Sequence, residues 1–384
     1  MHRLLIFALA VTGVAASVCA QAAVVVAKSD TEVIETLPAA LGNRADERKL
    51  RRQWAASPAN AELSVALAQR YMDQARAQGD PRYAGQALAV LQAWPDAAKA
   101  PDEVLLMQAT VQQYLHAFDA SAQLLERLVK RQPQHAQAWL TLATVRRVQG
   151  RYAESDKACA ALALTGAGMY AQACQAENDS LRGDVDGARA TLQRLLALPH
   201  SRAPVRNWLM TTLAEVEARA GRPVEAEAAY VAALHAQADA YTTLSYVDFL
   251  MQRDRDRDAL SQLEQQPRTD AVLLRLAIAG TRTRSPDAQR DVREMRDRMA
   301  LANLRPDART THAREQAMFA LWVDAKPQRA LELARVNVRL QREPLDLLLL
   351  ARAARASGQA NAVREAQQLR KEMGLHDERL DALL

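Results

Sequence analysis

Residues 139–155 read WLTLATVRRVQGRYAES, and this stretch decides the fold. Ala143 lies inside a helical pattern, where a small residue lets two helices approach each other closely. Gly150 follows seven residues later and can adopt the positive φ with which helices commonly end. Ser155 follows twelve residues after Ala143, on the next helical pattern, where it would face Ala143. The stretch therefore predicts two antiparallel helices joined by a tight turn.

The same spacing recurs along the chain. Its anchor is a small or medium apolar residue that returns every 30 to 41 residues. The anchors are Ala109, Ala143, Ala176, Ala214, Val247, Ala277, Met318 and Ala351. A glycine stands seven residues after four of them, namely Gly150, Gly183, Gly221 and Gly358. Because a single helical hairpin cannot bury its apolar stripe, neighbouring hairpins must stack into an all-α solenoid.

Composition favours the same fold class. The 384 residues are 49% hydrophobic but only 4% aromatic, so a core must be built mostly from Ala, Leu and Val. Ala and Leu are good helix formers. The 13 glycines and 14 prolines are too few for an all-β or a disordered chain of this length.

The pattern resembles that of the tetratricopeptide-repeat (TPR) proteins, whose helix-turn-helix units are 34 residues long. The clearest copy has the aromatic, Leu, small, Gly and Tyr positions of the family at Trp139, Leu140, Ala143, Gly150 and Tyr152. The resemblance covers residues 60–375 and implies a right-handed superhelix of antiparallel helix pairs, with about seven to nine repeats. It implies an interaction scaffold but names no partner, because one fold hosts many functions.

Residues 43–384 are expected to form the solenoid. A polar cap helix is predicted at 43–56, a first copy at 60–95 with a turn around Gly79, and a final helix at 360–373 that Gly374 ends. Residues 253–307 depart from the pattern. The stretch around Arg253 lacks the turn glycine, and residues 269–307 contain Ala277 but no clear second helix.

The first residues indicate export of a bacterial type. Residues 1–3 are a short basic region, residues 4–16 are apolar but too short to span a bilayer comfortably, and small residues precede Gln21. We therefore expect a cleaved signal peptide at 1–20, a flexible lead-in at 21–42, and a periplasmic or secreted protein. An uncleaved anchor over residues 4–27 is the alternative. Lipidation at Cys19 is disfavoured because Val18 stands where that processing site usually has a smaller residue.

Catalytic, metal and cofactor motifs are missing from the sequence. The seven histidines are scattered singly, whereas a metal site needs several converging ligands. There is no Gly-rich phosphate loop, no G-x-S-x-G elbow and no Cys-x-x-Cys pair. We expect a protein that is not an enzyme and that carries no cofactor.

Two cysteines remain after signal removal, Cys159 and Cys174. In the repeat register Cys159 lies on the second helix of one unit and Cys174 on the first helix of the next, at positions that face each other. They are candidates for a disulfide in an oxidising compartment, if their Cα atoms come within about 7 Å. Two buried free thiols are the alternative.

The charge balance does not indicate nucleic-acid binding. Lys and Arg exceed Asp and Glu by 50 to 45, a surplus too small and too dispersed for such a surface.

The concave groove of such a solenoid is lined by the first helix of each unit, and it is the expected binding surface. Its predicted residues mix aromatic and polar side chains, a composition common in peptide-binding surfaces. They are Gln113, Tyr114, Thr144, Arg147, Tyr170, Glu177, Trp208, Glu215, Tyr241 and Asp248. Glu177, Glu215 and Asp248 share one register and suggest an acidic stripe that holds a basic segment of a protein or a polar glycan. Ordinary solvated acids on helices are the alternative.

Some members of the family hold a partner's terminal carboxylate with a clamp of Lys and Asn. Here the corresponding positions carry Leu106, Leu140, Ala173 and Thr211, so that clamp is absent. The sequence therefore favours a periplasmic scaffold for a protein or peptide partner. The alternative is an envelope factor that binds a glycan or peptidoglycan directly.

Overall fold

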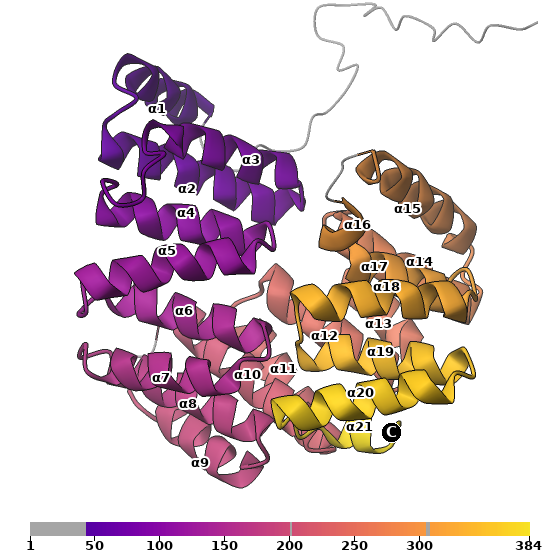
Figure 1. The fold of residues 1–384 in the computed structure, drawn as a ribbon. Coiled ribbons are helices and arrows are strands. Elements are labelled where there is room, and N and C mark those ends of the chain that lie inside the picture. Colours follow the sequence, from indigo (N-terminus) through magenta and orange to yellow (C-terminus); the bar gives the residue numbers. More distant parts are fainter. Residues whose placement is uncertain (1–43, 200–201, 305–307) are drawn as a thin grey trace, which may run out of the picture. The chain divides into compact units, whose positions relative to one another are not determined.

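The computed structural model describes residues 44–199, 202–304 and 308–384, and these residues contain helices and no strand (Figure 1). The segments expected to be the signal peptide and most of the lead-in, residues 1–43, lie outside the described residues. The chain from Gly42 to Leu384 forms one compact unit. None of the described helices is both long enough and apolar enough to cross a membrane.

The described helices follow one another in antiparallel pairs, nine in all within these residues. The pairs are α2 (Ala61–Gln78) and α3 (Pro81–Val90), α4 (Asp102–Tyr114) and α5 (Phe118–Arg131), α6 (Ala136–Val148) and α7 (Tyr152–Ala163), α8 (Gly168–Leu181) and α9 (Val185–Leu196), α10 (Ala203–Arg219) and α11 (Pro223–Ala236), α12 (Ala240–Gln252) and α13 (Asp256–Leu263), α14 (Asp270–Thr283) and α15 (Ala288–Ala302), α17 (Ala313–Trp322) and α18 (Pro327–Leu340), and α19 (Pro344–Ala356) and α20 (Ala360–Met373). Helix α1 (Arg44–Ala56) precedes them, and the short elements are η1 (Leu91–Ala93), α16 (Ala308–Thr311) and α21 (Glu378–Asp381).

Small residues allow the two helices of a pair to touch. Ala109 on α4 and Ser121 on α5 are fully buried, and the Ser121 hydroxyl donates to the Ala109 carbonyl over 2.8 Å. Ser155 on α7 makes the same contact with Ala143 on α6, over 2.9 Å. The predicted spacing of twelve residues therefore corresponds to a direct contact between the paired helices.

The turns between paired helices use the left-handed backbone conformation. Gly150 has a φ of 74° and Gly183 a φ of 105°. In the region that departs from the sequence pattern, Asp254 and Arg284 adopt this conformation with φ of 57° and 56°. A turn there needs no glycine, although a non-glycine residue adopts a positive φ less readily.

The segment after Ala277 contains a regular second helix, α15, where the sequence pattern indicated none. Asp291 and Met295 are the buried residues of α15, and most of its other side chains are charged or exposed. Because a helix is recognised mainly by its apolar stripe, α15 carried too weak a signal to be predicted.

The C-terminal helix pairs contact helix pairs from the middle of the chain. The amide of Arg342 donates to the Val148 carbonyl over 2.7 Å, and the amide of His376 donates to the Leu181 carbonyl over 2.8 Å. One apolar cluster joins Tyr152 and Leu181 with the C-terminal helices α18 to α21. In an open solenoid each repeat contacts only its neighbours. This solenoid is therefore closed by contacts between its middle and C-terminal pairs, which the repeat pattern did not predict.

Candidate functional site: the inner face

First helices of successive pairs contact one another all along the array, from α2 through α4, α6, α8, α10, α12, α14 and α17 to α19. We call the surface formed by the exposed side of α4, α6, α8, α10 and α12 the inner face. All ten groove residues predicted from the sequence lie on these five helices.

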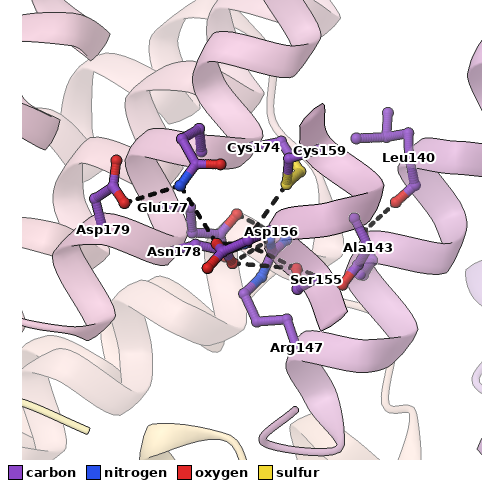
Figure 2. Close-up of a disulfide and its surroundings, with 12 residues drawn as sticks. Leu140, Ala143, Arg147, Ser155, Asp156, Cys159, Cys174, Glu177, Asn178 and Asp179 are labelled. Atoms are coloured by element: carbon purple, nitrogen blue, oxygen red, sulfur yellow. Dashed lines mark hydrogen bonds and ion pairs between the residues drawn. A yellow bond between two sulfur atoms is a disulfide. The ribbon is translucent and has the colours of Figure 1, made fainter. Parts of the chain in front are cut away.

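Several of these residues link neighbouring first helices. Tyr170 on α8 stacks on Trp208 of α10, with 5.7 Å between ring centroids. Arg147 on α6 pairs with Glu177 on α8 at 2.8 Å and also donates to Asn178 (Figure 2). The structure thus brings the central predicted residues together on one surface.

The predicted acidic stripe is largely neutralised within the chain. Glu177 is paired with Arg147, and both side chains are mostly buried. Asp248 accepts two hydrogen bonds from Arg275 of α14, at 2.5 and 2.7 Å. Arg275 was not among the predicted residues, because it lies one helix beyond the last predicted position. A continuous negative stripe is therefore absent, and Glu215 is the member without an arginine ion pair among the described residues.

Glu215 lies beside an exposed aromatic residue. Its carboxyl accepts a hydrogen bond from the Tyr241 hydroxyl over 2.7 Å, while the Tyr241 side chain is 62% exposed. Burial, and next the charge of Glu177, raise the pKa of Glu215 to about 7. Glu215 is thus a carboxyl that changes its charge near neutral pH next to a ring that faces solvent.

Two other predicted residues are committed to the backbone. Tyr114 donates its hydroxyl to the Ala75 carbonyl over 2.9 Å, and Thr144 donates to the Leu140 carbonyl over 3.0 Å. Gln113 is half-buried on α4. Tyr114 and Thr144 therefore support the helices.

Sequence reasoning missed the charged groups that surround Glu215. Arg219, one turn further along α10, is only 6% exposed and donates to the Ser180 hydroxyl over 2.8 Å. Glu343, which precedes α19, lies close enough to help raise the pKa of Glu215. The position of Arg219 four residues after Glu215 was a local signal, whereas nothing in the sequence placed Glu343 there.

The two cysteines form a disulfide that joins consecutive helix pairs. Cys159 on α7 and Cys174 on α8 are bonded, with 5.7 Å between their Cα atoms, and each is 1% exposed (Figure 2). The Asn178 amide donates to the Cys159 sulfur over 3.5 Å and to the Ser155 hydroxyl over 2.9 Å. Ser155, Asn178, Arg147 and Glu177 therefore link the disulfide to the inner face. No cluster of three metal-ligating side chains occurs in the described parts of the chain.

Comparison with known proteins identifies no family for this chain. No family model and no curated protein matches it. Among solved structures, it is similar to a tetratricopeptide repeat protein from Parabacteroides merdae ATCC 43184, with 14% sequence identity and a TM-score of 0.46 over 57% of this chain and 83% of that one. A likeness of this size adds no argument, so the helix-pair solenoid rests on this chain's own contacts.

Proposed function

We propose that this protein is a non-enzymatic interaction scaffold that acts in the periplasm or as a secreted protein and binds a protein or peptide segment on its inner face. The exposure of Tyr241 to solvent is the observation that carries the proposal. Its ring is 62% exposed next to Glu215, and it lies on the surface where Tyr170 and Trp208 stack. Exposed aromatic rings beside hydrogen-bonding groups are typical of the residues that dominate protein recognition.

Two features support action outside the cytoplasm. The first residues have the pattern of a signal peptide. The pairing of Cys159 with Cys174 suits an oxidising compartment, because disulfides persist there and are rare in the cytosol.

The internal ion pairs change what the partner is expected to be. Glu177 and Asp248 already hold Arg147 and Arg275, so they offer little free negative charge to a basic segment. Replacing both acids by lysine would also leave two partly buried arginines beside new positive charges. Such a variant would test folding rather than binding.

A sharper test compares an exposed residue of the inner face with an exposed residue on a second helix. Tyr241→Ala removes the exposed ring of the inner face, and Val224→Ala removes a side chain that is 76% exposed on the second helix α11. We expect the wild type and Val224→Ala to capture one defined protein from an envelope extract, and Tyr241→Ala to capture it at least tenfold less efficiently. Equal capture by both variants would contradict the proposal. Binding to purified sacculi without any protein would instead support a factor that binds peptidoglycan.

A further inference from the structure

A cavity of about 60 Å³ lies between the first helices of the C-terminal pairs, α12, α14, α17 and α19. Half of its lining residues are apolar, namely Met251, Met318, Trp322, Leu345, Leu348 and Leu349. Its charged lining consists of Arg275, Arg282, Arg314 and Arg352 with Asp248 as the one acid among them. The cavity therefore combines apolar walls with four arginines in its lining.

Three of these arginines are held by acids of the chain. Arg275 donates to Asp248 at 2.5 and 2.7 Å, as described above. Arg314 donates to Asp346 over 2.6 Å, and Arg282 donates to Asp256 over 3.2 Å. Their positive charge is thus largely balanced inside the protein.

Arg352 differs from the other three. Its guanidinium makes no hydrogen bond and no ion pair with any residue that the structure places, and it lies over the Trp322 ring at 6.0 Å. The guanidinium of Arg282 lies over the same ring at 5.3 Å. Burial lowers the pKa of Arg352, and the neighbouring charges of Arg282 and Arg379 lower it further. An arginine has five N–H donors, and those of the half-buried Arg352 face no carboxylate within ion-pair distance among the residues that the structure describes.

We propose that this cavity binds a carboxylate carried on an apolar group, with Arg352 as the ligand of the carboxylate. The proposal rests on the proposed function and specifies its partner as a segment in which an acidic side chain lies beside an apolar residue. Arginine and carboxylate match in geometry, because two parallel N–H donors meet two oxygens. A volume near 60 Å³ holds about two water molecules, which is enough for a carboxylate group. The apolar group that carries the carboxylate would contact the apolar side chains of the lining.

The test follows the indole N–H signal of Trp322 by NMR in the full mature chain labelled with ¹⁵N-tryptophan. The chain has five tryptophans, and Trp322→Phe identifies the signal. Hexanoate is the probe for a free aliphatic carboxylate, and the blocked dipeptide acetyl-Leu-Glu-amide is the probe for an acidic side chain in a peptide. Hexanol is the control for the apolar chain alone, and hexylamine, a cation at neutral pH, is the control for the sign of the charge. Arg352→Gln removes the proposed ligand, and Arg364→Gln removes an exposed arginine of α20 with the same change in charge.

We expect the Trp322 signal to shift saturably with the dipeptide and with hexanoate, and not with hexylamine or hexanol. Arg352→Gln should weaken binding about tenfold or more, because a charge-assisted hydrogen bond is lost, while Arg364→Gln should bind as the wild type does. An equal response to hexylamine, no response to either carboxylate, or equal affinity in the two variants would overturn the proposal. Because the probes need no partner protein, failure here with Tyr241-dependent capture intact would refute this site alone. The reverse result would refute the scaffold proposal and leave the cavity as a carboxylate site without that partner.

Discussion

Glu215 shows how one side chain of the inner face depends on pH. The folded protein keeps the proton of this carboxyl up to about pH 7, whereas the unfolded chain releases it near the ordinary value of 4.5. The folded state therefore binds more protons between these values. The free energy of unfolding must fall as the pH rises through this window.

Replacing Glu215 by Gln removes this ionisation and keeps an acceptor for the Tyr241 hydroxyl. We expect Glu215→Gln to be more stable than the wild type at pH 8 by about 1–3 kcal/mol, with a smaller difference at pH 5. Urea unfolding at the two pH values measures it. Glu225→Gln, on an exposed position of α11, is the control and should show no such change. Parallel behaviour of the two variants would show that Glu215 titrates normally.

Asp346 is a buried charge on which a local network depends. It is 0% exposed and accepts hydrogen bonds from Arg314 at 2.6 and 2.7 Å and from Asn337 at 2.6 Å. Asp346→Asn removes one of the two carboxylates that Arg314 contacts and leaves the partly exposed Glu343 as the other. We expect the free energy of unfolding to fall by about 3 kcal/mol, the lower end for a broken buried ion pair, because Glu343 still balances part of the charge.

A matched surface pair sets the scale for Asp346. Asp73 and Arg76 are about half exposed and 3.6 Å apart, so Asp73→Asn should cost about 0–1 kcal/mol. Denaturant unfolding of both variants measures the two losses in the free energy of unfolding. Similar losses for the two would mean that burial does not strengthen the Asp346 interaction.

At the level of the helices, the sequence predicted the pairing well because its signals are local. The anchor Ala143, the turn residue Gly150 and the facing residue Ser155 lie within one hairpin, and each has the predicted role. Helix α15 escaped prediction because its buried stripe is too sparse. The ion pairs of Glu177 and Asp248 were not predicted, although Arg147 itself was named as a groove residue. A helix pattern gives the face on which a residue lies and not which charge the neighbouring helix presents to it.

The disulfide joins the second helix of one pair to the first helix of the next, over a sequence separation of 15 residues. In the protein made without residues 1–20, alkylation under denaturing conditions without reductant should add no mass. Cys159→Ala with Cys174→Ala should lower the free energy of unfolding by about 3 kcal/mol, since the loop constraint on the unfolded chain is lost. Reductant should then destabilise the wild type and leave the double variant unchanged. Alkylation of both cysteines before reduction would show that the thiols are free.

On the scale of the whole array, closure depends on contacts between residues far apart in sequence, such as Val148 with Arg342 and Leu181 with His376. No repeat spacing records them, because each unit's pattern encodes contacts with its neighbours. Turn residues of the middle pairs thereby have a second role. They must be small enough for the C-terminal segment to approach.

Gly150 and Gly358 have the same backbone conformation, but only Gly150 lies against the C-terminal segment. Comparing them distinguishes the role of a glycine in the turn from its role in the closing contact. Gly150 has a φ of +74°, and a Cβ there would lie 2.9 Å from the Met373 Cε and 3.1 Å from the Arg342 Cβ. Gly358 has a φ of +69° and open space around it. Both alanine variants carry the cost of a positive φ, and we expect Gly150→Ala to lose about 1–3 kcal/mol more, because it also crowds the closing contact. Equal losses in urea unfolding would argue against closure at this turn.

The central claim is that the inner face holds the partner. A photo-crosslinking amino acid at position 241, where the native tyrosine is 62% exposed, tests it in cells, and the same residue at position 224 on α11, 76% exposed, is the control. Irradiation should join position 241 to one defined protein and leave position 224 without that product. The same product from position 224 and none from position 241 would contradict the claim.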